Sequence, residues 1–272
     1  MSGELALRRY KAATAAKPSG ARSSDVRRVA LRPIGGRAHD ARQLGEVVAD
    51  AIVDAVAQGT LEPLARIKEL DLARQLGVSR VPIREAIKLL QAQGILNVTP
   101  NRGARVAPFD PPMIEQVYEA RIALERIAVR DALAAYRREP RLLDGLREII
   151  SRMERMARWS DWVEFRKCDV AFHREICRAS GNEIVLKLWE ALAQHITIIF
   201  GRELASERNF AVVIDQHRKL LDMFESGDRT LEQVIEGHIV RLRGAAAKSA
   251  SNRGQRGTNG RRTASPSSKA LR

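Results

Sequence analysis

The chain has 272 residues and a formal net charge of +14, with 44% hydrophobic and 4% aromatic residues. This length allows one or two compact domains, and the hydrophobic content can supply their cores. No apolar run approaches the roughly 18 residues of a membrane span, and the first residues lack the apolar stretch of a secretory signal. Cys168 and Cys177 fall on opposite faces of one expected helix and cannot pair with each other, so we expect a reduced, cytoplasmic protein that does not bind a membrane.

Most of the positive charge lies in two terminal segments. Residues 1–40 hold nine Lys and Arg against three acidic residues, and residues 244–272 hold seven against none. Both segments are rich in Ala, Ser, Gly and Arg and lack apolar periodicity, so we predict disordered basic tails at 1–40 and 247–272. Such tails would raise nonspecific affinity for nucleic acid through counterion release but would specify no sequence.

Residues 41–108 are predicted to form a winged helix-turn-helix. Apolar residues at helical spacing from Leu44 to Val56 indicate a first helix. A short helix that stops at Gly77 follows, and the next helix begins almost at once. A helix, a tight glycine turn and a second helix have the spacing of a helix-turn-helix.

The helix after Gly77 has clear start signals, and a wing is expected behind it. Ser79 is a suitable N-cap, and Pro82 falls in the first turn, where its missing N–H costs no helical hydrogen bond. The stretch 94–109 then indicates strand, turn and strand, with its tip at 100–103.

A basic stripe marks the expected recognition helix. Arg80, Arg84 and Lys88 are spaced by four residues and share one face, opposite an apolar face. Between Arg74 and Arg105 there are six basic residues and one acidic residue, so positive charge is focused on one part of a folded region. Such a helix enters the major groove of DNA, where arginine can bond guanine bidentately; an ordinary solvated basic helix is the alternative. The predicted DNA-binding residues are Ser79, Arg80, Arg84, Lys88, Arg102 and Gly103.

Residues 109–246 are predicted to form an all-α domain that binds an effector and dimerises. No strand-like alternation occurs there, and turn signals at 180–182 and 226–228 separate helical stretches. The expected helices cover 111–138, 140–159, 162–180, 183–202, 206–226 and 231–246. The predicted fold is therefore mostly α, with an N-terminal winged helix-turn-helix followed by a helical bundle.

Several polar residues lie on the apolar faces of these helices. Asp169 and His173 are four residues apart, so both can reach one ion, and His195, His217 and His238 lie on other helices. Buried polar groups need partners, and facing helices of a bundle can assemble metal sites. A carboxylate with three imidazoles suits a divalent transition metal such as zinc, nickel or iron. Periodicity does not choose His217 and His238 over His195, and a single histidine is more often a satisfied core residue.

The helix-turn-helix segment resembles a known family. The sequence LARQLGVSRVPIREAIKLLQAQGIL, followed by NRGARV, is similar to the DNA-binding domain of GntR-family bacterial transcription regulators. The resemblance implies DNA contacts from Arg80 and Arg84 in the recognition helix and from Gly103 in the wing. The chain departs from the family pattern at three places, with Val81 for a threonine, Leu64 for a glycine and Leu70 for an arginine.

The helical region resembles the FCD-type effector domain of FadR-like members of that family. The similar segments are VYEARIALE, DVAFHREICRASGNEIV, DQHRKLLDMFESGD and IEGHIVRL. Metal-binding members take ligands from an Asp-x-x-x-His helix and two later histidines. The matching positions are Asp169, His173, His217 and His238. The resemblance implies small organic acids as effectors, held by the metal and a buried arginine, for which Arg121 is the candidate; an internal salt bridge from Arg121 to Glu125 or another helix is the alternative.

We therefore predict a ligand-responsive transcription factor that binds a palindromic DNA operator as a homodimer and is not an enzyme. An effector that favours one dimer geometry would change the spacing of the recognition helices and thus DNA affinity. A metalloenzyme built on the bundle is the first alternative, although four protein ligands leave few open metal positions. A protein that coats nucleic acid through its tails is the second, although few aromatic residues are present for base stacking.

Overall fold

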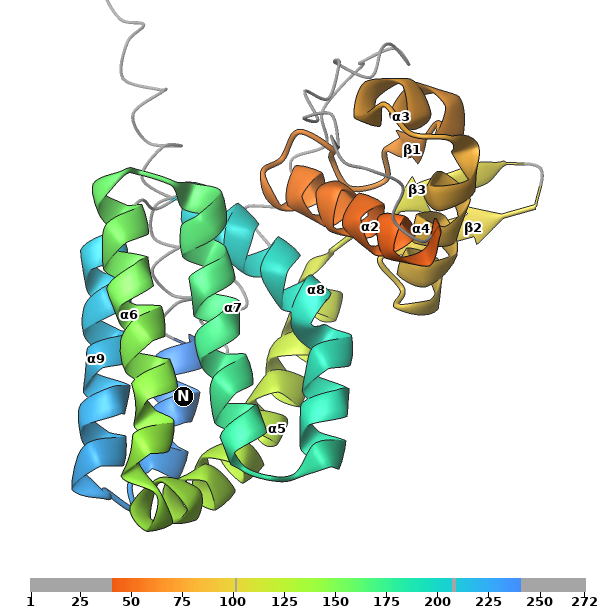
Figure 1. Ribbon diagram of the computed structural model, residues 1–272. Helices are drawn as coiled ribbons and strands as arrows, with labels where there is room; N and C mark the ends of the chain where they lie inside the picture. The colour runs from red at the N-terminus through yellow and green to blue at the C-terminus, as the bar shows by residue number, and fades with distance from the viewer. Residues whose placement is uncertain (1–40, 101, 207–208, 241–272) are drawn as a thin grey trace, which may run out of the picture.

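The computed structural model describes residues 41–100, 102–206 and 209–240, which form two lobes (Figure 1). The smaller lobe contains α2 (Ala41–Ala57), β1 (Arg66–Ile67), α3 (Glu69–Leu76), α4 (Arg80–Ala92), β2 (Leu96–Thr99) and β3 (Gly103–Val106). The larger lobe contains α5 (Pro111–Arg138), the short helix η1 (Pro140–Leu142), α6 (Leu143–Arg158), α7 (Trp162–Ala179), α8 (Glu183–Ser206), α9 (Phe210–Ser226) and a helix over 231–240. The predicted tails at 1–40 and 247–272 lie outside the described residues.

The helix-turn-helix forms as predicted, from local backbone signals. Gly77 ends α3 in the left-handed conformation, with φ of 69°, and its N–H bonds the carbonyl of Ala73. Ser79 occupies the N-cap position of α4 in an extended conformation, but its side chain makes no capping hydrogen bond. Pro82 is buried in the first turn of α4, where its missing N–H costs nothing.

The wing is a three-stranded antiparallel sheet with strand order β1-β3-β2. The hairpin of β2 and β3 confirms the predicted strand, turn and strand. The third strand, β1, was not predicted because two residues carry no readable alternation. Its register places Arg66 opposite Arg105.

Helix α2 packs along the back of the recognition helix α4. The two helices approach closely at Gly45, where a Cβ atom would lie 3.0 Å from Cβ of Glu85. Buried aliphatic residues of both helices, such as Ile52 on α2 and Ile83 on α4, fill the space between them. Any displacement of α2 is therefore passed to α4 by direct packing.

Helix α7 lies at the centre of the larger lobe, packed against α5, α6 and α8 (Figure 1). Its start is fixed by Asp161, whose side chain accepts a hydrogen bond of 3.1 Å from the N–H of Glu164. The predicted boundary between the next two helices was less accurate. Helix α8 runs to Ser206, and α9 begins only at Phe210, because Asn209 supplies the N-cap by accepting from the N–H of Val212.

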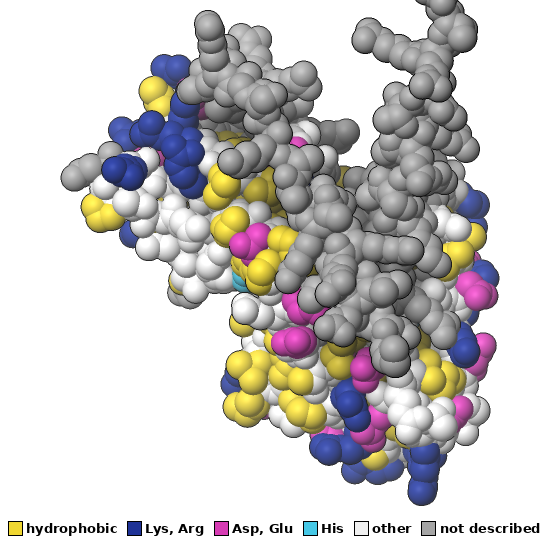
Figure 2. Space-filling model, turned by 180° about the vertical axis from the view of Figure 1, so that it is seen from behind, with side chains coloured by type: hydrophobic (Ala, Val, Ile, Leu, Met, Phe, Trp, Pro, Cys, Tyr) yellow, Lys and Arg dark blue, Asp and Glu magenta, His cyan; other side chains and the backbone are white. Residues whose placement is uncertain are grey.

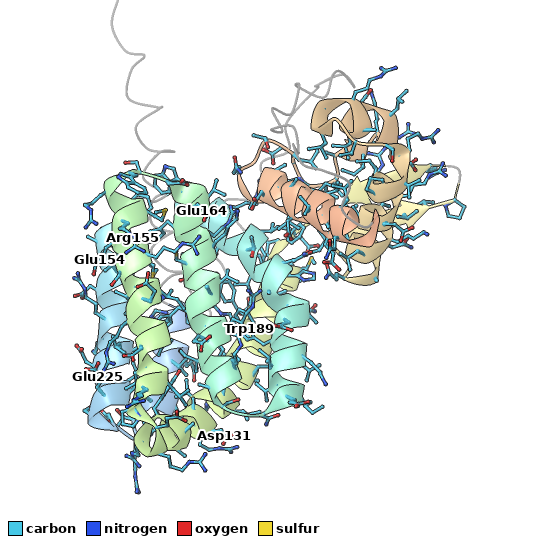
Figure 3. The ribbon with its side chains drawn as sticks, viewed as in Figure 1. Asp131, Glu154, Arg155, Glu164, Trp189 and Glu225 are labelled. Atoms are coloured by element: carbon cyan, nitrogen blue, oxygen red, sulfur yellow. The ribbon has the colours of Figure 1, made fainter. Side chains whose placement is uncertain are left out.

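Helix α8 is more apolar than the sequence expectation allowed. Its segment Glu183–Glu203 has a mean hydropathy of 1.3 over an 18-residue window, so by length and composition it could cross a membrane. The expectation that no segment approaches this length is therefore wrong by that measure. Half of the window is buried inside the structure, as in a core helix, which meets the same criterion. In Figure 3, Trp189 belongs to α8 and lies within the bundle, where it is fully buried.

Candidate DNA-binding surface and candidate metal centre

The predicted basic stripe is exposed on α4. The side chains of Arg80 and Arg84 are each 58% exposed and that of Lys88 is 71% exposed. Ser79, Arg102 and Gly103 are also exposed. Figure 2 shows Lys and Arg side chains gathered on the smaller lobe near the wing. All six predicted DNA-binding residues are thus accessible to a partner from solvent.

Glu69, the first residue of α3, holds both arginines of the stripe. Its Oε2 accepts hydrogen bonds from Nε of Arg84 at 3.0 Å and from Nη2 of Arg80 at 3.3 Å. The hydrogen bond from Arg84, aided by Arg80, lowers the pKa of Glu69 below its ordinary value, so the carboxylate is ionised at neutral pH. Sequence reasoning missed Glu69, because only the packing of α3 on α4 brings it to the stripe.

The base of the wing carries two further arginines, Arg66 and Arg105. They face each other across β1 and β3. Nη1 of Arg105 donates to the carbonyl of Leu64 at 3.0 Å. The side chain of Arg66 passes Gly103, within 3.8 Å of the place that a Cβ would occupy there. Arg66 was missed with its strand, and it extends the basic surface from the helix to the wing.

Three buried histidines meet inside the larger lobe. His173 on α7, His217 on α9 and His238 on the helix over 231–240 each offer a ring nitrogen, and these atoms lie within 4.8 Å of one another. Nε2 of His173 is 3.2 Å from Nε2 of His238. Two nitrogens bound to one zinc ion at tetrahedral angles stand roughly 3.3 Å apart. The spacing therefore fits two ligands of one ion.

Asp169 adds a carboxylate to this cluster. Its Oδ1 lies 3.2 Å from Nε2 of His217, and both side chains are fully buried. Apart from this contact, neither carboxylate oxygen has a hydrogen-bond partner among the described residues. Burial alone would raise the pKa of Asp169, but attraction to His217 and His173 holds it below the ordinary value. A buried, ionised carboxylate whose close polar neighbour is an imidazole fits a cation ligand beside that imidazole.

In His173 and His217 the other ring nitrogen, Nδ1, is held by the protein, which points Nε2 of these two rings into the cluster. Nδ1 of His217 donates to the carbonyl of Val213 at 2.7 Å. Nδ1 of His173 lies 2.7 Å from Oε2 of Glu125. Arg121 and His173 overcome burial and keep the pKa of Glu125 well below its usual range, so the carboxylate accepts this bond. Burial lowers the pKa of His173, which favours the neutral ring that binds metal.

Arg121 lies beside the cluster and forms a buried ion pair on its own helix. Its Nε donates to Oε1 of Glu125 at 2.7 Å, which is the internal salt bridge considered as the alternative. Its Nη2 is buried and has no hydrogen-bond partner among the described residues. Trp189 donates to the same Oε1 at 2.9 Å, so Glu125 binds Arg121, His173 and Trp189 together. Glu125 lies four residues after Arg121, on the same face of α5. This spacing could have marked Glu125 as a residue of the buried site.

His195 is not part of the cluster. It lies on α8, and its ring packs against Phe109 with centroids 6.1 Å apart. The structure thus separates the histidines that periodicity could not distinguish, bringing Asp169, His173, His217 and His238 together.

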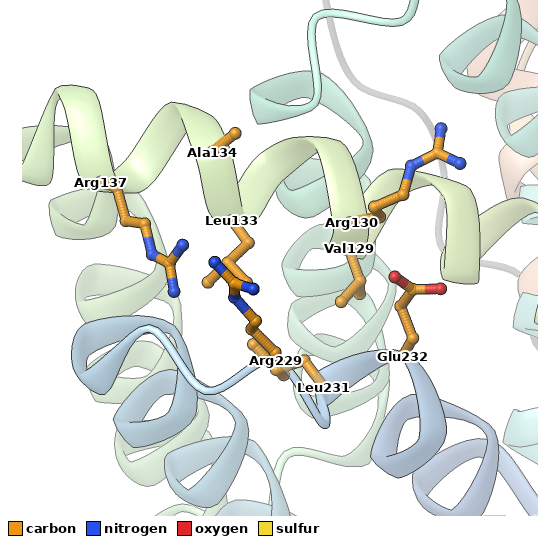
Figure 4. A pocket seen from close by; sticks show the side chains of 8 residues that line it. All are labelled: Val129, Arg130, Leu133, Ala134, Arg137, Arg229, Leu231 and Glu232. Carbon is orange, nitrogen blue, oxygen red and sulfur yellow. The ribbon is translucent and has the colours of Figure 1, made fainter.

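An open surface pocket lies elsewhere on the larger lobe, between α5 and the segment 229–232 (Figure 4). Its floor is apolar, with Val129, Leu133 and Leu231, and arginine side chains stand at its rim. None of the residues lining it belongs to the histidine cluster.

A winged helix-turn-helix with an exposed basic recognition helix, joined to a helical domain with a buried polar site, defines the class of ligand-binding transcriptional regulators. Comparison with known proteins agrees. Residues 44–106 match the family model described as "Bacterial regulatory proteins, gntR family", and residues 116–241 match that of the FCD domain. The chain belongs to the GntR family of transcriptional regulators and carries an FCD domain, which is a ligand-binding effector domain. This confirms the resemblance, the fold class and the regulatory function predicted from the sequence.

Two relatives illustrate the family. The chain is 32% identical over 203 residues to a probable D-xylose utilization operon transcriptional repressor of Paenarthrobacter nicotinovorans, covering 74% of this chain and 88% of that protein. It is 28% identical to the gluconate operon transcriptional repressor of Bacillus subtilis, covering 65% and 73%.

Solved structures share the fold. Escherichia coli McbR/YncC superposes with a TM-score of 0.60 at 22% identity, covering 79% of this chain and 99% of that one. A putative GntR regulator from Rhodococcus sp. RHA1 gives 0.59 at 20% identity, covering 77% and 98%.

Proposed function

We propose that the protein acts in the cytoplasm as a homodimer that binds a palindromic operator, and that a small carboxylate metabolite bound at a divalent metal in the larger lobe modulates its DNA affinity. The observation that carries the effector part is the buried cluster of Asp169, His173, His217 and His238 beside an unpartnered donor of Arg121. Zinc, nickel or iron suits this set of one carboxylate and three imidazoles.

The buried cluster would supply each part of an organic-acid site. Asp169 and the three Nε2 atoms would hold the metal, which when bound supplies a Lewis acid for a carboxylate. Arg121 Nη2 offers a charge-assisted hydrogen bond to that same ligand. One relative is named for gluconate, a sugar acid, which supports a carboxylate as the chemical class.

The recognition helix supports direct reading of bases. Arg80 and Arg84 stand at its N-terminal end, exposed to solvent, where bidentate bonds to guanine are possible. Val81 lies between them with 56% of its surface exposed. An apolar side chain there would favour contact with a thymine methyl group. We therefore propose an operator half-site that combines guanine with thymine.

Dimerisation is supported by an apolar face on α8. Ile184 is 64% exposed and Leu188 is 52% exposed, although the helix is otherwise a core element. Burial of such side chains against a second copy is favourable, and a two-fold protein matches a palindromic site.

The regulator is tested by affinity selection of fragmented genomic DNA at near-physiological salt, comparing the wild type with the Arg80→Ala/Arg84→Ala double variant. We expect the wild type to enrich a few palindromic sites and the variant to lose them, since each bidentate arginine contributes about 1–3 kcal/mol of discrimination. Broad enrichment that the variant retains would contradict sequence-specific binding by α4 and assign DNA binding to charge alone.

A further inference from the structure

An ion pair between a buried arginine and a half-buried aspartate joins the two lobes. Nη2 of Arg166 on α7 donates to Oδ1 of Asp54 on α2. The side chain of Arg166 is 3% exposed and that of Asp54 is 22% exposed. Removing one partner of a buried pair leaves an uncompensated charge, which is strongly unfavourable. The pair therefore restricts the lobes to arrangements in which the two side chains meet.

Gly201 allows three helices to meet at this ion pair. A Cβ at this position of α8 would lie 2.6 Å from Nη1 of Arg166 and 2.9 Å from Cβ of Ala57 on α2. Glycine inside a helix costs about 1 kcal/mol relative to alanine, so its presence here reflects packing and not helix propensity. The packing need is the close approach of α2, α7 and α8 around the guanidinium of Arg166.

The facing surfaces of the lobes carry opposite charges. Other polar contacts between the lobes include Lys167 Nζ to Asp54 Oδ2 at 3.6 Å, Arg202 Nη2 to Glu62 Oε2 at 2.8 Å, Arg202 Nη1 to the carbonyl of Val56 at 3.3 Å, and Gln194 Nε2 to Asp50 Oδ1 at 3.4 Å. Lys167 is 47% exposed and Glu62 is 64% exposed, and exposed pairs contribute little. Among these contacts, the Arg166–Asp54 pair, with its buried guanidinium, is the one that can fix the orientation of α2.

Arg166 also belongs to the helix of the candidate metal centre. It precedes Asp169 by three residues and His173 by seven, so about 4.5 Å and 10.5 Å of continuous helix separate them. A shift of α7 at the metal centre must move Arg166 with it. Asp54 then carries that shift to α2, which packs directly on the recognition helix at Gly45.

We propose that the Arg166–Asp54 pair couples the candidate metal centre to the recognition helix, so that both residues act as positioning residues for DNA binding. The inference rests on the proposed function, because it requires a ligand at the centre and an operator at α4. A ligand shifts the arrangement of the lobes only by its differential affinity for them. Although α2 also packs on α8, the ion pair is the contact that ties α2 to α7, the helix of the metal centre. Without it, this link between the two sites is lost.

The test is the zinc dependence of operator affinity in the full-length protein. The Kd for an operator fragment from the genomic selection is measured with Zn²⁺ and with EDTA, for the wild type, Arg166→Gln and Asp54→Asn. Lys167→Gln is the matched control, because it removes the neighbouring, exposed partner of Asp54. We expect a ratio of about fivefold or more in the wild type and the control, falling to about one in both variants while bound zinc is unchanged.

A purely structural role would weaken DNA binding equally with and without zinc and leave the ratio intact. Retention of the full ratio in the variants therefore overturns the coupling. A wild type that binds zinc without any change in Kd also overturns it and leaves the metal centre standing. Asp54→Asn, which changes a partly exposed residue, decides the question if Arg166→Gln does not fold.

A wild type that binds no zinc contradicts the proposed metal centre. The link is then decided by hydrogen exchange in the metal-free protein, which reports local opening. Faster exchange in both α2 and α7 of Arg166→Gln supports the coupling. A change confined to α7 overturns it.

Discussion

At the scale of single residues, Glu69 orients the two arginines that we assign to base reading. Nε of Arg84 donates its hydrogen bond to Glu69, so the two Nη groups of Arg84 are free to bond a base edge. We predict that Glu69→Gln lowers the ratio of operator to nonspecific affinity several-fold, because both arginines lose their fixed orientation, while nonspecific affinity stays equal or rises. Electrophoretic titrations against the operator and a scrambled sequence measure this ratio.

Glu85→Gln is the matched control for Glu69. The Glu85→Gln variant also removes one negative charge, here from the recognition helix itself. Glu85, however, pairs with Lys88 at 2.9 Å and not with Arg80 or Arg84. Affinity should rise for both DNA sequences and leave their ratio unchanged. Equal effects of the two variants on the ratio would show that the charge of Glu69 matters and its contact with the arginines does not.

At the scale of elements, α8 buries His195 against Phe109, and this burial makes stability depend on pH. Burial against Phe109 and its surroundings lowers the pKa of His195 below the ordinary value of 6.5. The unfolded chain therefore takes up more protons than the folded one as the pH falls through about 6.5, and the free energy of unfolding decreases. We predict that His195→Gln reduces this acid destabilisation, measured as the difference in urea midpoint between pH 7.5 and 5.5. The same pH difference in wild type and variant would contradict the assignment, since contributions from other histidines cancel.

Most helices and the wing hairpin could be predicted from the sequence, because helix caps and apolar periodicity depend on neighbouring residues. Gly77 ends α3 through its own backbone, and Ser79 and Pro82 lie at the start of α4, where the sequence signals placed it. The strand β1 was not readable, since its two residues gain their conformation only by pairing with β3. The boundary after α8 was misplaced because α8 extends to Ser206, and the N-cap of α9 is Asn209, whose side chain accepts from the N–H of Val212.

At the scale of the whole molecule, periodicity identified which residues are buried but not which of them meet. Asp169, His173, His217 and His238 were found on apolar faces, yet their selection over His195 required the resemblance, and their contacts required the fold. Asp54 and Arg166 gave no signal at all. They lie 112 residues apart, and each is ordinary within its own helix.

The metal centre itself makes the last prediction, because an ion that binds only the folded chain stabilises it. Zinc at 100 times its Kd would add about 2.7 kcal/mol to the free energy of unfolding, so we expect Zn²⁺ to raise the melting temperature and EDTA to lower it. His217→Ala and His238→Ala should abolish this response and the zinc content measured by mass spectrometry. His195→Gln is the matched control, since it changes a buried histidine outside the cluster and should keep both. Full zinc content in His217→Ala would remove His217 from the ligand set. If His195→Gln equally lost the zinc-dependent rise in melting temperature, the variants would act through folding and not through the metal.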